Sequence, residues 1–317
     1  MSRTLGRNLL AIALMAGMAI AIYSAVGASL GGKDFVRALS SVSAAQLAAL
    51  LGLSLVNYAL RLLRWSWYLR RLGHRIPFGR DCLYYLAGFA LTVSPAKAGE
   101  AVRGVYLKKH GVPYSDTFAA LVAERLLDVL AVAVLGALIL PLFGQYWWLV
   151  GVAAAIVLAV TIIVTRQATP RVLESAAARF GTRIGGLLVH VARLLRSAAA
   201  LLRPGLLLPG LAIGLASWAA EGFGLYLLLG WLGLPVSIEA GMGVYALSML
   251  AGALSFLPGG LGGAEAALAI LVVALGGSSA VAFAATVICR AATLWFAVVI
   301  GLLALIVLET RPLRAVG

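Results

Sequence analysis

Long apolar runs dominate the chain and are separated by short polar segments. The runs lie at residues 8–30, 46–63, 117–143, 146–165, 205–232, 240–257 and 280–308. Most of them reach the roughly 20 residues that a helix needs to cross the hydrocarbon core of a bilayer. Runs of this length predict α-helices rather than the short strands of a barrel. The pattern therefore predicts an all-α polytopic membrane protein with about six spanning helices.

Two parts of the chain contain pairs of shorter runs that are interrupted by proline and glycine. The first pair occupies 83–95 and 97–109, and the second occupies 241–257 and 262–276. The interruptions lie at Pro95 and Gly99 in the first pair and at Pro258, Gly259, Gly260, Gly262 and Gly263 in the second. Because each run is short for a crossing, each pair is predicted to form a broken, re-entrant helical hairpin. The second pair is more apolar, so two short crossings remain an alternative there.

The two halves of the chain resemble each other in sequence. Residues 100–134 align without a gap with residues 265–299, and residues 53–73 align more weakly with residues 213–233. The equivalent positions include Glu100 and Glu265, Arg125 and Arg290, and Arg61 and Glu221. Each repeat is therefore interpreted as a spanning helix, a broken hairpin and a second spanning helix. Three spanning helices separate equivalent elements, and because that number is odd, the second repeat is predicted to be inverted in the membrane.

A single transmembrane domain is predicted to fill residues 1–317. Its parts are an N-terminal helix and outer loop (1–45), a first repeat (46–143), a linking helix with a cytoplasmic amphipathic helix (146–205), a second repeat (206–308) and a cytoplasmic tail (309–317). The amphipathic helix is inferred from polar side chains at helical spacing within 170–203, among them Arg179, Arg183 and Arg193. A simple basic loop is the alternative for this segment.

Composition and charge support a membrane location and give it an orientation. Of the 317 residues, 63% are hydrophobic and 11% are charged, and the mean hydropathy is +1.04, which is too apolar for a soluble domain. The net charge of +14 comes from basic residues that concentrate in 61–109, in 166–203 and near both termini. The positive-inside rule places these segments and both termini on the cytoplasmic side of a bacterial-type inner (plasma) membrane. Because the basic residues are distributed among loops and do not form a soluble basic domain, nucleic-acid binding is not expected.

Charged residues inside the predicted membrane segments form the candidate site. They are Glu100, Arg103, Arg125, Asp128, Glu221, Glu265 and Arg290. A charge at the centre of a spanning helix costs about 2.5 kcal/mol or more, so such residues usually face a partner or a water-filled cavity. Under one hypothesis, each hairpin glutamate pairs with the arginine that opens the next helix, and at least one arginine also binds a lipid phosphate. Under the other, the charges are internal ties that satisfy the broken hairpins.

Local spacing suggests further contacts for this site. Asp128 lies three residues after Arg125, so a pair within one helix is expected. An inverted repeat axis would also allow Glu221 to approach its equivalent, Arg61. The proline and glycine breaks are expected either to offer backbone N–H groups to an anion or only to permit tight turns and close packing.

Residues for catalysis or metal binding are scarce. The histidines, His74, His110 and His190, fall in predicted loops without an acid that suggests a triad or a metal site. The two cysteines, Cys82 and Cys289, lack metal-ligand spacing. No cofactor and no metal are therefore expected, and an intramembrane hydrolase is disfavoured, whereas a membrane enzyme acting on lipid headgroups is kept as a third hypothesis.

Four features of the sequence stand out together, namely Pro95-x-x-x-Gly99-Glu100-x-x-Arg103, Glu124-Arg125-x-x-Asp128, Pro258-Gly-Gly-x-Gly-Gly-x-Glu265 and the later Arg290. In combination they resemble the transmembrane domain of lysylphosphatidylglycerol synthase and its stand-alone, flippase-like relatives. The resemblance spans about residues 50–308 and implies a domain that moves an aminoacylated lipid between leaflets, whereas a separate soluble domain makes that lipid. This chain ends soon after its last predicted helix, so we expect the translocating architecture without aminoacyl-transfer activity, and no enzyme.

The leading hypothesis is flippase-like translocation of an amphipathic lipid through a polar path between the two hairpins. The lipid could be a phospholipid, an aminoacyl-lipid or a polyprenyl-linked lipid, and its headgroup is expected to be anionic or to bear phosphate. A membrane-enzyme partner or a homo-oligomer is compatible with this hypothesis. The alternative is a non-transporting, lipid-binding scaffold or an accessory subunit of a lipid- or glycan-modifying enzyme.

Overall fold

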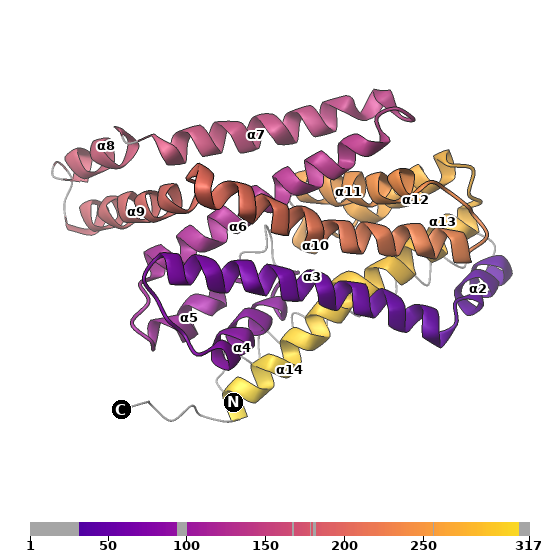
Figure 1. Ribbon diagram of the computed structural model, residues 1–317, viewed down its shortest axis with the longest axis horizontal. Helices are drawn as coiled ribbons and strands as arrows, with labels where there is room; N and C mark the ends of the chain where they lie inside the picture. Colours follow the sequence, from indigo (N-terminus) through magenta and orange to yellow (C-terminus); the bar gives the residue numbers. More distant parts are fainter. Residues whose placement is uncertain are drawn as a thin grey trace.

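The computed structural model describes residues 32–93, 100–166, 168–177, 179, 182–255 and 257–310, and these segments are helical almost throughout (Figure 1). No strand occurs among them, which confirms the predicted all-α class. The expected first helix at 8–30, the breaks at Pro95 and Gly99, and the C-terminal tail from residue 311 lie outside the described residues.

The described part of the chain contains thirteen α-helices. In order they are α2 (Gly32–Ser41), α3 (Ala44–Arg71), α4 (Phe78–Phe89), α5 (Arg103–Lys108), α6 (Tyr114–Gly136), α7 (Trp147–Thr165), α8 (Ala168–Ala177), α9 (Thr182–Leu201), α10 (Pro204–Trp231), α11 (Ile238–Leu254), α12 (Gly263–Ala274), α13 (Ser279–Arg290) and α14 (Phe296–Thr310). A π-helical segment, Ala291–Trp295, joins α13 to α14.

Several of these helices are long and apolar enough to cross a bilayer. Four described stretches meet this condition, namely Ala44–Arg71, Ile184–Leu201, Pro204–Trp231 and the continuous Ser279–Thr310. A fifth candidate joins Val150–Thr165 to Ala168–Ala177 across a 61° bend. Helix α6 is 23 residues long, about 34 Å at the rise of an α-helix, and it carries three charged residues near its middle. The chain is therefore a polytopic membrane protein.

The segment predicted as one amphipathic helix forms two helices instead. Helices α8 and α9 pack side by side, and Arg196 of α9 lies 2.5 Å from Glu174 of α8. Helix α9 also packs along α6, where the hydroxyl of Ser197 donates to Asp116 at 2.7 Å. One face of α9 therefore packs against protein, which differs from a helix that lies alone on the membrane surface.

The helix boundaries repeat at the spacing of the sequence alignment. Helices α3 and α10 are both 28 residues long and begin 160 positions apart. Helices α4 and α11 also begin 160 positions apart, whereas α6 and α13 begin 165 apart. The change in spacing matches the lengths of α4 and α11, which are 12 and 17 residues. The five added residues therefore lie inside the second hairpin.

The first helices of the two repeats also end in the same way. Gly73 follows α3 with φ 92°, and Gly233 follows α10 with φ 81°. The next N–H group reaches back to the helix in each case, from His74 to the carbonyl of Leu69 and from Leu234 to the carbonyl of Leu229, both at 2.9 Å. Glycine adopts this left-handed backbone at little cost, so both repeats use the same helix stop.

The two repeats run in opposite directions along the long axis of the molecule (Figure 1). Helix α3 runs from the end that holds α2 toward the end that holds α4 and α5, and α10 runs the opposite way. The first hairpin lies toward one end and the second hairpin, α11 with α12, toward the other. This arrangement is the inverted repeat that the sequence predicts, and it directs the two broken hairpins toward each other.

Close backbone packing fixes the first hairpin against the last helix. Helix α14 packs along α4, and a Cβ atom added at Gly301 would overlap the backbone nitrogen of Ala90. Elsewhere, a Cβ atom at Gly241 would lie 2.6 Å from the Cβ atom of Tyr226, where α11 packs on α10. Small residues of this kind allow helices to approach closely in a membrane, where packing rather than hydrophobic exclusion holds them together.

We expect Gly301→Ala to destabilise the protein by about 1–3 kcal/mol, because the added methyl group has no space against α4. The measurement is the midpoint of thermal unfolding in detergent. The matched control is Gly230→Ala in α10, where nothing lies within 4 Å of the added atom and a helical alanine should be neutral or slightly stabilising. Equal midpoints for the two variants would contradict the close contact.

Labelling of single cysteines tests the orientation, which we expect to place the α4 and α5 end in the cytoplasm because basic residues collect there. In a background without Cys82 and Cys289, Ser40→Cys on α2 should react with a membrane-impermeant maleimide added to intact cells. Ser175→Cys on α8 should react only after the cells are permeabilised. Both positions are exposed, so the reverse pattern would show the opposite orientation.

Candidate functional site

A charged cluster lies inside the first repeat. Its members are Arg61 and Arg64 of α3, Glu100 before α5, Arg103 of α5, and Glu124, Arg125 and Asp128 of α6. All are buried except Arg125, whose side chain is 27% exposed. Four arginines and three acids give the cluster one surplus positive charge, so it has the capacity to attract an anion.

Asp128 is the acid that holds most of the cluster together. One carboxylate oxygen accepts from Nη2 of Arg64 at 2.5 Å. The other lies 3.3 Å from Nη2 of Arg125 and 3.5 Å from Nη2 of Arg61. The expected local pair between Arg125 and Asp128 is thus confirmed, and the same carboxylate links α6 to α3.

Arg103 connects the first hairpin to α6. Its guanidinium donates to Glu100 at 2.9 Å and to Glu124 at 3.1 Å, and it lies 4.0 Å from the ring centroid of Tyr85. A Cβ atom at Gly88 would lie 2.5 Å from Nε of Arg103, so a glycine on α4 makes room for this arginine. The contact joins α4, α5 and α6 around one buried cation.

Glu100 makes the pair that the repeat predicted, with a second partner in addition. It lies 3.5 Å from Arg125, which confirms the expected pair, but it is closer to Arg103. Thr92 also donates its hydroxyl to Glu100 at 3.1 Å. The hairpin glutamate is therefore shared between two arginines.

The second repeat contains a simpler pair. Nε of Arg290 donates to Glu265 at 2.8 Å, which confirms the other expected pair, and Nη2 donates to the carbonyl of Gly259 at 2.9 Å. Glu265 also accepts the N–H group of Gly262 at 2.8 Å, and the N–H group of Gly260 donates to Leu257. These two N–H groups are satisfied within the protein, which favours tight turns over an anion site at this break.

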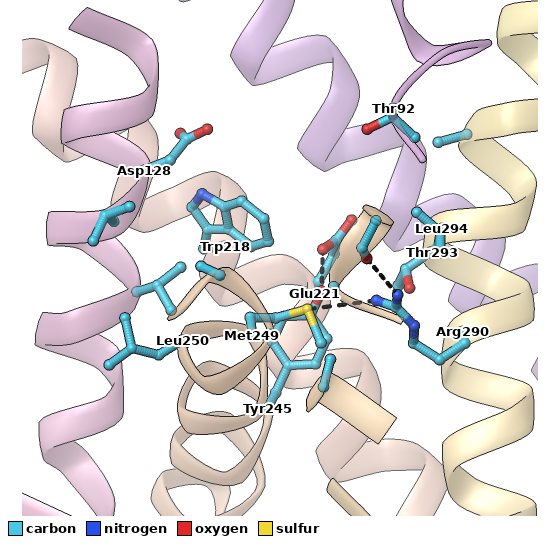
Figure 2. A pocket seen from close by; sticks show the side chains of 18 of the residues that line it. Thr92, Asp128, Trp218, Glu221, Tyr245, Met249, Leu250, Arg290, Thr293 and Leu294 are labelled. Atoms are coloured by element: carbon cyan, nitrogen blue, oxygen red, sulfur yellow. Dashed lines mark hydrogen bonds between the residues drawn. The ribbon is translucent and has the colours of Figure 1, made fainter. Parts of the chain in front are cut away.

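A cavity of about 450 Å³ lies where the two repeats meet. One wall carries Arg61, Arg125 and Asp128 from the first repeat, and the other carries Glu221 and Arg290 from the second. Figure 2 shows Trp218, Tyr245 and Met249 around the same space, with Glu221 and Arg290 directed toward it. The hydroxyl of Tyr245 donates to Glu221, and that of Tyr58 donates to the carbonyl of Thr293 at 2.6 Å. Charged and apolar surfaces therefore alternate around this central cavity.

The structure divides the predicted site residues into two groups. Arg125, Asp128, Glu221 and Arg290 line the central cavity, together with Gly259 and Gly260 of the second break. Glu100, Arg103 and Glu265 are not among the lining residues and instead hold the lining arginines or their neighbours. The remaining described breaks, Pro258, Gly262 and Gly263, are not among the lining residues either. Arg61 and Glu221 face one cavity from equivalent positions, as the repeat axis suggested.

Two arginines of α3, Arg61 and Arg64, belong to the site although they were not among the predicted site residues; Arg61 was expected only as a partner for Glu221. Arg64 is fully buried, and Arg61 is 4% exposed. A signal was present, because Asn57, Arg61 and Arg64 follow one another at helical spacing within an apolar stretch. Asn57 is buried as well, and its amide donates to the carbonyl of Ser217 on α10 at 2.9 Å. Polar residues at helical spacing on a long apolar helix thus indicate a buried polar face.

Comparison with known proteins identifies the family of the chain. Residues 8–301 match the lysylphosphatidylglycerol synthase TM region. The chain belongs to this family. A UPF0104 membrane protein of Methanothermobacter thermautotrophicus is 28% identical to the chain over 282 residues, which cover 80% of this chain and 82% of that protein.

A second relative matches a shorter part of the chain. The glycosyltransferase AglD of Haloferax volcanii is 32% identical over 109 residues, which are 34% of this chain and 18% of that protein. The chain thus spans less than a fifth of the glycosyltransferase. The family membership supports a membrane function related to lipids.

We expect Asp128→Asn to destabilise the protein by about 3–5 kcal/mol, because three neighbouring guanidiniums would lose their shared negative charge inside the membrane. Thermal unfolding in detergent measures this loss. The matched control is Asp34→Asn on α2, whose ion pair with Arg37 is exposed and should contribute no more than about 1 kcal/mol. Similar small effects for both variants would show that Asp128 does not hold the cluster.

Proposed function

We propose that the protein moves an amphipathic lipid between the leaflets of its membrane by passing the headgroup through the central cavity. The observation that carries the proposal is the position of this cavity, which lies between two oppositely directed repeats and is lined by charges from both. Inverted-repeat transporters place substrate sites where their broken helices meet. The family membership supports a lipid as the substrate.

The size and lining of the cavity suit a lipid headgroup. A volume of about 450 Å³ lies within the range of roughly 300–1,000 Å³ that is usual for small-molecule sites. Arg61, Arg125 and Arg290 supply positive charge for a phosphate, and Glu221 and Asp128 supply negative charge. The apolar side chains between them would contact the first carbons of the lipid while its tails stay in the bilayer.

The translocation step follows from the cost of moving a polar group through hydrocarbon. A headgroup that crosses unaided loses its water and gains nothing in return. In the cavity, fixed arginines and acids replace part of that water, which lowers the barrier. Rocking of one repeat against the other would open the cavity to each leaflet in turn. We propose gradient-driven or passive exchange by a transporter rather than catalysis, with the protein in a plasma membrane and both termini in the cytoplasm.

A second candidate function is a lipid-binding accessory part of a glycan-modifying system. The observation that favours it is the match of 109 residues to a protein named as a glycosyltransferase. In that case the cavity would hold a lipid-linked substrate without moving it. Buried ion pairs such as that of Arg290 with Glu265 would then serve stability alone.

Lipid exchange in reconstituted liposomes tests the proposal. The liposomes carry a fluorescent phosphatidylglycerol, an aminoacylated phosphatidylglycerol or a polyprenyl phosphate, and a membrane-impermeant quencher reports the outer leaflet. The wild type should speed the exchange of at least one lipid over protein-free liposomes. Arg125→Ala and Arg290→Ala should slow that exchange about tenfold or more, since each removes a charged hydrogen-bond donor from the cavity.

The matched control is Arg37→Ala, which removes an exposed arginine on α2 and should leave the rate unchanged. Monodispersity of each variant in detergent shows that it is folded. Exchange no faster than in protein-free liposomes for all three lipids would contradict translocation and would favour the accessory function.

A further inference from the structure

Arg61 differs from the other buried arginines of the charged cluster in its hydrogen bonding. Its side chain is 5% exposed, and it lines the central cavity. Neither its Nε nor its Nη2 atom has a hydrogen-bond acceptor among the described residues. Its Nη2 atom lies 3.5 Å from Asp128, which is an ion pair but no hydrogen bond. Buried guanidinium donors without an acceptor are costly, so donors of this kind at a cavity are suited to bind an anionic ligand.

Aromatic side chains hold this arginine in place. The guanidinium carbon of Arg61 lies 5.8 Å from the ring centroid of Phe89 and 5.5 Å from that of Trp218. Rings at this distance attract a guanidinium through its face. The donor edge then remains available for an acceptor in the plane of the group. Arg61 is thus prepared for a ligand before the ligand arrives.

Arg125 provides a second donor in the same cavity. Its side chain is the most exposed of the cluster, and its Nε atom also has no acceptor in the described structure. Nη2 of Arg125 lies 3.3 Å from the Asp128 oxygen that Nη2 of Arg61 approaches at 3.5 Å, so the two guanidiniums flank one carboxylate. Two guanidiniums that share a neighbour in this way can both reach one oxygen-rich anion.

We propose that Arg61 binds the phosphate of the translocated headgroup, with Arg125 as the second contact. The assignment of a lipid to this phosphate rests on the proposed function. The planar fork of an arginine matches two phosphate oxygens, and phosphate accepts from several donors at once. The charged residues that line the cavity are three arginines and two acids, so a surplus of positive charge faces a bound headgroup. Because Asp128 is already bound by Arg64 at 2.5 Å, its charge is largely compensated and does not repel the phosphate strongly.

Equilibrium binding in detergent tests the assignment without requiring transport. The probe is dihexanoyl-phosphatidylglycerol, and dihexanoylglycerol, which lacks the phosphate, is the comparison ligand. Titration calorimetry on the full chain gives both dissociation constants. Arg61→Gln should weaken binding of the phosphate lipid by about 10- to 100-fold, which corresponds to loss of a charged hydrogen bond. Binding of the neutral lipid should stay the same, whereas a misfolded variant would lose both.

Two further variants separate a direct contact from an effect of the cluster. Arg61→Lys keeps the charge without the fork, so it should bind the phosphate lipid several-fold less tightly, and it serves if Arg61→Gln does not fold. The matched control is Arg37→Gln, which removes an exposed cation on α2 outside the cluster and should leave the binding of both lipids unchanged. Binding of the phosphate lipid by Arg61→Lys as tight as that of the wild type would assign the effect to charge alone and overturn the direct contact.

The remaining outcomes distinguish this inference from the proposed function. Unchanged phosphate-lipid binding in Arg61→Gln would refute the assignment of Arg61 even if the wild type exchanges lipids. Arg61-dependent binding by a protein that exchanges no lipid would support the site and refute translocation. Inorganic phosphate is the competing probe. If inorganic phosphate binds more weakly than the phosphate lipid, the result supports a headgroup ligand. If the two bind with equal affinity, the site would be assigned to free phosphate and the lipid part of the proposal would be overturned.

Discussion

Compensation of positive charge inside the membrane determines the arrangement of the first repeat. A buried arginine is tolerated when its guanidinium has an acid or a wet cavity beside it, and Asp128 supplies that acid to α3 and α6 together. Low polarity around the cluster strengthens each attraction and makes each missing partner costly. Helix α3 therefore cannot slide or rotate along α6 without separating Arg64 from Asp128. The cationic wall of the cavity is a consequence of this constraint.

The two repeats share the arrangement of their helices but differ in the charged residues that those helices carry. At the repeat spacing, Arg64 corresponds to Gly224, Glu124 to Cys289 and Asp128 to Thr293. The second repeat has the tie between Arg290 and Glu265, and it uses that arginine to hold the glycine break through the carbonyl of Gly259. Equivalent helices thus carry a charged cluster in the first repeat, and an arginine that holds a glycine turn in the second. Under the proposed function, a headgroup would meet unlike surroundings on the two walls of one cavity.

Sequence reasoning predicted the architecture better than the site. The length of the apolar runs and the repeat spacing were sufficient for the inverted arrangement, and the equivalent pairs of Glu265 with Arg290 and Glu100 with Arg125 are present. The polar members of α3 were underestimated because Arg61 lies near the end, and Arg64 just beyond the end, of the apolar run at 46–63. Helix α3 continues to Arg71, so these arginines lie within the helix rather than at its end. Only the fold shows that Asp128, 64 positions after Arg64, compensates them.

The helix after Arg290 shows how the asymmetry extends to the backbone. Helix α6 continues past Arg125 as a regular α-helix, whereas its counterpart changes to a π-helical segment at Ala291–Trp295. Such segments loosen the regular hydrogen-bond ladder and are frequent at functional sites. The carbonyl of Thr293 in this segment accepts from Tyr58 of α3 across the cavity edge at 2.6 Å. The second repeat therefore has an irregular helical segment beside the cavity, and this segment is tied by a hydrogen bond to the helix of the first repeat that carries Arg61 and Arg64.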